Sequence, residues 1–172
     1  MVVSRSEGST RIMPRLLRQK RLSIGVVGYG YWGPNLVRNF RELSTTRVAM
    51  LADLDQRRLD QAAERYPGLT TTQSINDLLT SRVDGVVVAT PVSTHFAIAR
   101  DCLLHGKHVL VEKPLAQTAA QAQTLVELAA ERGLTLMVGH TFVYSPAVEM
   151  LKAIVESGEL GEIYYVHSSR TN

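Results

Sequence analysis

The sequence is poor in cysteine and is not enriched in proline or glycine. Its 172 residues include one cysteine, six prolines and twelve glycines. These numbers exclude an internal disulfide, a cysteine zinc cluster and a collagen-like or low-complexity chain. No apolar run approaches the roughly 20 residues that a membrane-spanning helix needs. We therefore expect a soluble, cytoplasmic protein without a membrane partner, with Cys102 packed in its core.

Positive charge is scarce outside the first 21 residues. Residues 1–21 contain six basic side chains and one acidic one, a net charge of +5, whereas residues 22–172 carry a net charge of −2. A nucleic-acid surface needs basic residues clustered on a folded face, so we expect no nucleic-acid partner. The basic leader lacks the apolar stretch of a secretory signal. We predict that this leader is disordered. The alternatives are that it is an organellar transit peptide or that the protein starts at Met13.

From Leu22 onward, apolar strand-like runs alternate with helical stretches. Strands are expected over residues 22–28, 47–53, 84–90, 107–113 and 134–140, with a weaker one near 69–72, and helices over 34–42, 56–66, 75–80, 95–105 and 118–132. The continuous apolar character of the runs is typical of strands covered by helices on both faces. The alternation predicts an α/β fold, a doubly wound parallel sheet of the Rossmann type with right-handed crossovers.

The pattern changes after Tyr144. Residues 145–158 read as one more helix, and the sequence from Glu162 onward reads as a strand. Since this strand has no partner in the predicted sheet, we assign residues 22–144 to the Rossmann domain and residues 145–172 to a linker helix and the first strand of a second α+β domain. An unpaired apolar strand recruits another edge, so we also expect a homo-oligomer or a separately encoded second domain.

A glycine-rich motif follows the first predicted strand directly. The segment Gly28-Tyr29-Gly30-Tyr31-Trp32-Gly33 matches G-x-G-x-x-G between a strand and a helix. In such motifs the first glycine permits the tight turn, the second lets the backbone approach a diphosphate, and the third lets the helix pack closely on the strand. The motif predicts a dinucleotide site, the alternative being a glycine-rich turn without a ligand.

An acidic residue stands where a dinucleotide ribose would be bound. Asp53 ends the second predicted strand, 20 residues after Gly33, a spacing at which a carboxylate binds the ribose hydroxyls. This favours NAD, although the neighbouring Arg57 and Arg58 leave NADP open. Asp53 is also a candidate helix N-cap, but Asp55 is better placed for that position.

Three further segments end predicted strands at the same sheet edge. Thr90, Pro91 and His95 follow one strand, with His95 equally suited to a structural role. Glu112, Lys113 and Pro114 follow the next, and His140 follows the last. The Lys113 ammonium is suited to polarising a substrate oxygen or to proton transfer, against the alternative of a surface ion pair with Glu112. His140 titrates near neutrality and is a second catalytic candidate; no histidine spacing indicates a metal site.

The segments GYGYWGPN, ATPVSTH, EKPLA and GHTFVYSPAV, in this order, resemble the glucose-fructose oxidoreductase, inositol dehydrogenase and MocA family, and most closely its sugar-nucleotide branch. The resemblance covers about residues 22–172. It implies NAD(P)-dependent oxidation of a secondary hydroxyl of a sugar or sugar nucleotide, or the reverse reduction. It assigns catalysis to Lys113 and implies a cis peptide before Pro114. Cofactor contacts are implied at Gly28, Gly30, Tyr31, Trp32, Asp53, Thr90, Pro91, His95 and Glu112. We also expect Tyr29, Gly33 and Lys113 to contact the cofactor.

Members of that family are about twice as long as this chain, and their second domain supplies most substrate contacts. Two hypotheses follow. The chain is a dehydrogenase that passes hydride between a sugar carbon and nicotinamide, or it is an NAD-binding module without activity of its own.

Overall fold

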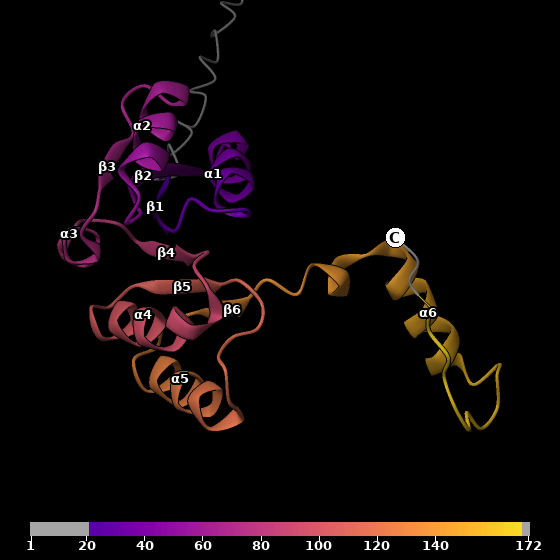
Figure 1. The fold of residues 1–172 in the computed structure, drawn as a ribbon. Helices are drawn as coiled ribbons and strands as arrows, with labels where there is room; N and C mark the ends of the chain where they lie inside the picture. The colour runs from indigo at the N-terminus through magenta and orange to yellow at the C-terminus, as the bar shows by residue number, and fades with distance from the viewer. Residues whose placement is uncertain (1–20, 170–172) are drawn as a thin grey trace, which may run out of the picture.

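The computed structural model describes residues 21–169 as a parallel sheet flanked by helices, followed by a separate C-terminal helix (Figure 1). The strands are β1 (Leu22–Val27), β2 (Thr46–Ala52), β3 (Thr70–Thr72), β4 (Gly85–Val88), β5 (His108–Val111) and β6 (Leu136–Val138). The helices are α1 (Gly33–Glu42), α2 (Gln56–Arg65), α3 (Ile75–Thr80), α4 (Val92–Leu104), α5 (Ala119–Glu131), the short 3₁₀ helix η1 (Thr141–Tyr144) and α6 (Pro146–Ser157). The disordered leader predicted for residues 1–21 lies, apart from Arg21, outside the described residues.

The sheet has the strand order β3-β2-β1-β4-β5-β6, and every pairing is parallel. The order reverses between β1 and β4, which are neighbours in the sheet although two strands separate them in the sequence. This is the topology of a doubly wound Rossmann fold, so the predicted fold class is confirmed. Within residues 21–169, no helix combines the length and the apolar character needed to cross a membrane.

Two apolar clusters cover the two faces of the sheet. One joins β1 and β2 to α1 and α2 and is centred on Val26, Val37 and Leu59; the other joins β4 and β5 to α3, α4 and α5 and includes Val88 and Leu103. The central strands β1 and β4 are therefore buried on both sides, as their continuous apolar sequences predict, whereas the edge strands β3 and β6 are only partly buried.

The predicted helices form, and most end within one residue of the predicted positions. Asp55 caps α2 by accepting a hydrogen bond from the Arg57 N–H, and Thr118 caps α5 in the same way through Gln121. Helix α4 is the exception, because it begins at Val92, three residues before the predicted start. Pro91 takes the extended N-cap position there, where the absence of an N–H costs nothing.

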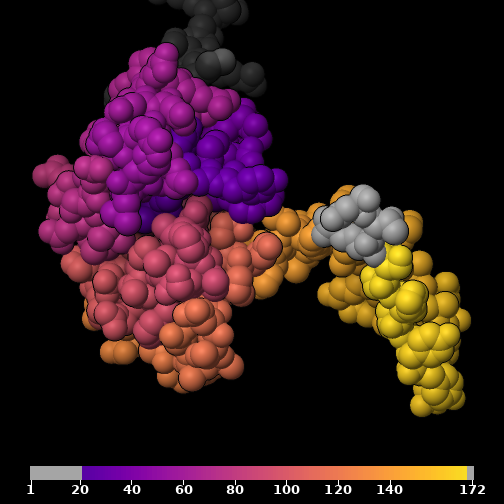
Figure 2. Space-filling model, in the orientation of Figure 1, coloured from indigo at the N-terminus to yellow at the C-terminus, as the bar shows by residue number. Residues whose placement is uncertain are grey.

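The strand predicted from Glu162 onward does not form in the described residues. Residues 163–169 have no regular secondary structure. A strand is stabilised by ladder hydrogen bonds to a neighbour, and no strand of the described part pairs with this segment. Helix α6 and residues 158–169 extend from the Rossmann domain as an arm (Figure 2).

This C-terminal arm exposes many apolar side chains. Met150, Leu151, Tyr164 and Tyr165 are between 62% and 85% exposed. Exposed apolar surface of this kind favours association. We expect the chain to form dimers or larger species as its concentration rises in sedimentation velocity experiments. A strictly monomeric profile at high concentration would contradict this prediction.

Cys102 lies in the core, as predicted, with no exposed surface. Burial, reinforced by the nearby Asp101 charge, raises the pKa of its thiol to about 12. The thiol therefore stays protonated at neutral and mildly alkaline pH, and the thiolate is the reactive form. We expect a thiol reagent to leave the native chain unmodified at pH 8 and to modify one thiol per chain in denaturant. Stoichiometric labelling of the native chain would show that the core opens at α4.

Candidate dinucleotide site

A cavity of about 1030 Å³ lies at the carboxyl ends of β1, β2, β3 and β4. This is the edge of the sheet at which ligands bind in doubly wound folds, and it contains the point where the strand order reverses. Most lining residues come from the four loops and the first turns of the helices that follow them: Gly28, Gly30, Tyr31 and Trp32 after β1; Asp53, Leu54, Asp55 and Arg58 after β2; Gln73, Ser74, Ile75 and Asn76 after β3; and Ala89, Thr90, Pro91 and Thr94 after β4. Val27, Ala52 and Ile98 complete the lining.

The three motif glycines differ in what surrounds them. Gly28 has a φ of +96°, and a Cβ there would lie 2.6 Å from the Ala89 carbonyl oxygen. A Cβ on Gly33 would lie 2.3 Å from the Gly28 carbonyl oxygen, so Gly33 is what lets α1 start against the loop. A Cβ on Gly30 would meet only Arg58 Nη1, at 3.8 Å. The fold therefore requires glycine at residues 28 and 33, whereas at Gly30 it leaves open space on the cavity side.

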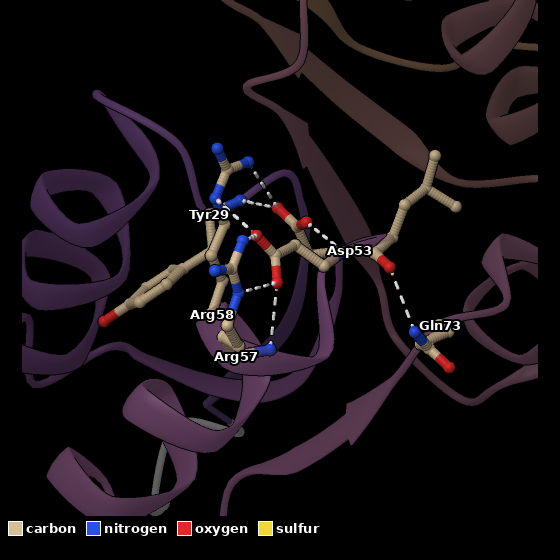
Figure 3. Close-up of polar contacts among 7 residues, drawn as sticks. Tyr29, Asp53, Arg57, Arg58 and Gln73 are labelled. Atoms are coloured by element: carbon tan, nitrogen blue, oxygen red, sulfur yellow. Dashed lines mark hydrogen bonds and ion pairs between the residues drawn. The ribbon is translucent and has the colours of Figure 1, made fainter.

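Asp53 fixes the glycine loop to the end of β2. Its carboxylate accepts hydrogen bonds from the Tyr29 N–H at 2.6 Å and from the Asp55 N–H at 2.8 Å, and its side chain is only 6% exposed. Figure 3 shows the Tyr29 N–H and the Arg58 guanidinium meeting the same carboxylate oxygen, and Arg58 Nη1 lies 3.6 Å from this Oδ2 atom. Each carboxylate oxygen has a second lone pair, so Asp53 can accept further hydrogen bonds from a ligand in the cavity.

A small charged network surrounds Asp53. Asp55 accepts hydrogen bonds from the Arg57 side chain and lies 3.8 Å from Arg58 Nε. The hydrogen bond from the Arg57 side chain lowers the pKa of the Asp55 carboxyl below its ordinary value, so Asp55 stays ionised at neutral pH. Gln73 donates to the Leu54 carbonyl oxygen at 3.0 Å and joins the β3 loop to this network (Figure 3).

The aromatic residues of the glycine motif take different positions. Tyr31 and Trp32 line the cavity, and their rings meet edge to face with centroids 5.3 Å apart. The Tyr29 side chain points into the core instead and is 6% exposed, and burial raises the pKa of its phenol. The ligand contact expected of Tyr29 is corrected accordingly, because its N–H is bonded to Asp53 and its ring faces away from the cavity.

The residues after β4 also differ in where their side chains lie, some at the cavity and one in the core. Thr90, Pro91 and Thr94 line the cavity, and the Thr94 hydroxyl is hydrogen-bonded to both the Thr90 hydroxyl and the Pro91 carbonyl. His95 is 1% exposed, and its two ring nitrogens each lie 2.8 Å from a backbone carbonyl oxygen, one of Thr90 and one of Pro114. No ring nitrogen is left for a ligand, so the direct cofactor contact implied for His95 is corrected to the structural role that was its alternative.

The remaining candidates lie at the ends of β5 and β6, outside this cavity. Glu112 is half-buried beside Gly139, where a Cβ would come within 3.4 Å of Glu112 Oε1. Lys113 and His140 are exposed. The Lys113–Pro114 peptide is cis, as the resemblance implies. Within residues 21–169 no ion pair joins Lys113 to Glu112.

Sequence reasoning missed the β3 side of the cavity. Gln73, Ser74, Ile75 and Asn76 line it, but the short β3 strand carries no glycine motif or charged signal. The topology of the sheet could have indicated this side of the cavity. A strand that pairs in parallel with β2 ends at the same edge of the sheet as Asp53, so the residues that follow it lie near Asp53.

Comparisons with known proteins identify the family of this chain. The sequence model described as "Oxidoreductase family, NAD-binding Rossmann fold" (GFO_IDH_MocA) matches residues 22–140. Inositol 2-dehydrogenase of Rubrobacter xylanophilus is 36% identical over 144 residues, which are 83% of this chain and 42% of that protein. UDP-N-acetylglucosamine 3-dehydrogenase of Acidithiobacillus ferrooxidans is 33% identical over 129 residues, 74% of this chain and 40% of that protein.

A solved structure shares both the fold and part of the sequence. KijD10, a 3-ketoreductase from Actinomadura kijaniata in complex with TDP-benzene and NADP, superimposes with a TM-score of 0.76 at 30% identity, over 84% of this chain and 46% of KijD10. The chain thus spans less than half the length of the relatives it matches. The family match covers the whole sheet and every loop of the cavity, and the chain belongs to the glucose-fructose oxidoreductase, inositol dehydrogenase and MocA family of NAD-binding oxidoreductases.

Proposed function

We propose that this chain is the coenzyme-binding part of an NAD(P)-dependent dehydrogenase that acts on a secondary hydroxyl of a sugar or sugar nucleotide. One observation carries the proposal: an open cavity at the switch point of the sheet combines the glycine loop with the Asp53 carboxylate. The names of the relatives, which include an inositol dehydrogenase and a sugar-nucleotide dehydrogenase, support the substrate class.

The residues present fit a nicotinamide dinucleotide. The open space at Gly30 admits a diphosphate close to the backbone, and the N-terminus of α1 favours its negative charge. Asp53 would accept hydrogen bonds from the adenosine ribose. Arg58, beside Asp53, offers a positive charge to a 2′-phosphate, so we propose NAD as the coenzyme with NADP accepted as well.

A bound nicotinamide supplies the hydride acceptor or donor. The residues of the chain would bind the coenzyme and transfer the proton of the substrate hydroxyl. Lys113, at the carboxyl end of β5, would stabilise the substrate oxygen or take its proton, with His140 at the end of β6 as a second proton-transfer group. Both side chains are solvent-exposed, and both lie at the same edge of the sheet as the cavity.

The alternative is an NAD-binding module that has no catalytic activity of its own. The observation that supports this alternative is that Lys113 and His140 do not line the cavity. Mixing the chain with NAD or NADP and a panel of inositols, sugars and sugar nucleotides, and following nicotinamide absorbance, separates the two. We expect turnover under the dehydrogenase proposal. Coenzyme binding without turnover on any compound would leave the silent module.

We predict that Lys113→Ala lowers turnover by about 100-fold or more, the usual contribution of a positioned proton-transfer group. Coenzyme affinity should stay within about twofold of the unmodified chain, since Lys113 does not line the cavity. Lys152→Ala, which removes an exposed lysine from α6, is the matched control and should change neither quantity. Equal turnover for the two variants would remove Lys113 from the mechanism.

A further inference from the structure

His95 is an unusual side chain for the core of this protein. It lies in the first turn of α4 and is 1% exposed, and the other largest fully buried side chains are all leucine or valine. Burying a polar ring is costly unless its nitrogens are hydrogen-bonded. An aliphatic residue would fill this position in the core at lower cost. The hydrogen bonds of the ring therefore indicate a role beyond packing.

The ring bridges two loops that follow neighbouring strands. Nε2 lies 2.8 Å from the carbonyl oxygen of Thr90, in the loop after β4 that lines the cavity. Nδ1 lies 2.8 Å from the carbonyl oxygen of Pro114, in the loop after β5. Pro114 directly follows Lys113, so a single buried side chain connects the cavity wall to the backbone that carries the lysine.

Each carbonyl can only accept a hydrogen bond, so the ring must act as the donor. A neutral imidazole donates from one nitrogen and an imidazolium from both. Both 2.8 Å contacts are hydrogen bonds when each ring nitrogen carries a proton, and in that form the ring ties the two loops together. An aliphatic replacement would leave both carbonyls without a donor.

We propose that His95 is a positioning residue that holds the Lys113 loop in a fixed place relative to the coenzyme cavity. The inference rests on the proposed function, which gives the cavity and Lys113 their roles. The effect on chemistry follows because a reacting group must be held within a fraction of an ångström of its productive position.

The two bonds can be tested separately, because the side-chain amide of asparagine places its nitrogen near His Nδ1 and that of glutamine near His Nε2. His95→Asn should therefore keep the bond to Pro114, and His95→Gln should keep the bond to Thr90. Both replacements are polar and smaller than or similar to histidine. Thermal unfolding followed by circular dichroism identifies any variant that has lost the fold.

Amide hydrogen exchange of the chain without coenzyme gives the readout. In His95→Gln we expect the amide of Glu112, which donates to the Val88 carbonyl beside the Lys113 loop, to exchange about tenfold faster than in the unmodified chain, the effect of losing one buried hydrogen bond. In His95→Asn it should stay near the original rate, while the amide of Thr94, which donates to the Pro91 carbonyl in the Thr90 loop, exchanges faster. His105→Ala removes a histidine on the same helix whose ring bonds only its own helix, at the Asp101 carbonyl, and should change none of these rates.

A crossed pattern supports the proposal. Equal acceleration of both loops in both variants, or no acceleration in either, overturns it. In a preparation that turns over, His95→Gln should also lower kcat while the KM for NAD stays unchanged; an unchanged kcat would overturn the positioning role. Because exchange is measured without coenzyme, a chain that fails to bind NAD would refute the proposed function and leave the exchange test valid.

Discussion

Gly30→Ala should weaken NAD binding by at least about tenfold while changing the free energy of unfolding by no more than about 0.5 kcal/mol. A Cβ at this position meets only the end of the Arg58 side chain, at 3.8 Å, and the backbone there is not in the left-handed region. The fold therefore tolerates the methyl group. The added carbon occupies the space in which the diphosphate approaches the backbone, and affinity is lost for that reason.

Gly33→Ala is the matched contrast. Its Cβ would lie 2.3 Å from the Gly28 carbonyl oxygen, so α1 and the loop must move apart, and we expect a loss of about 1 to 3 kcal/mol of stability. Urea unfolding measures stability, and calorimetric titration with NAD measures affinity. If Gly30→Ala binds NAD as tightly as the unmodified chain, the diphosphate does not lie over this loop.

Asp53→Ala should lower both the free energy of unfolding and the affinity for the coenzyme. The substitution leaves the Tyr29 and Asp55 N–H groups without their acceptor. Hydrogen bonds to a charged group contribute about 1.5 to 3 kcal/mol each, so we expect a loss of about 2 to 4 kcal/mol when partial solvation of the loop is allowed for. Asp53→Asn keeps one carbonyl oxygen as acceptor and should lose about half as much.

The same substitution should shift coenzyme preference. Removing the carboxylate takes away an acceptor for the ribose hydroxyls and also releases Arg58, now 3.6 Å from it, toward a 2′-phosphate. We expect the NAD dissociation constant to rise at least about fivefold more than the NADP dissociation constant. Asp60→Ala, which removes an exposed carboxylate one turn further along α2, should leave stability and preference unchanged. Equal losses for the two coenzymes would mean that Asp53 acts only through the loop.

The sheet and helices could be predicted because each strand is an apolar run bounded by a clear signal. The glycine loop before α1, the Thr118 cap of α5 and the left-handed Gly106 and Gly133 all take the conformations that their residue types favour. The segment from Glu162 onward could not be treated in this way, because strand formation depends on a partner and a local sequence does not contain one.

The candidate site could be predicted wherever the position of a residue at the end of a strand is enough to place it at the cavity. Gly28, Gly30, Asp53 and Thr90 follow directly from strand ends and line the cavity. Side-chain direction was less predictable. Whether His95 faces the cavity or the core depends on the loop after β5, which lies 19 residues away in the sequence and whose path is set by tertiary contacts.

Every role proposed above depends on the binding of a nicotinamide dinucleotide in the cavity between the glycine loop and Asp53. Calorimetric titration of the folded chain with NAD and with NADP tests it directly. The site geometry predicts saturable binding at one site per chain, with a dissociation constant of about 1 mM or tighter for NAD and quenching of Trp32, the single tryptophan, over the same range. Chain that unfolds cooperatively yet takes up neither coenzyme would contradict it.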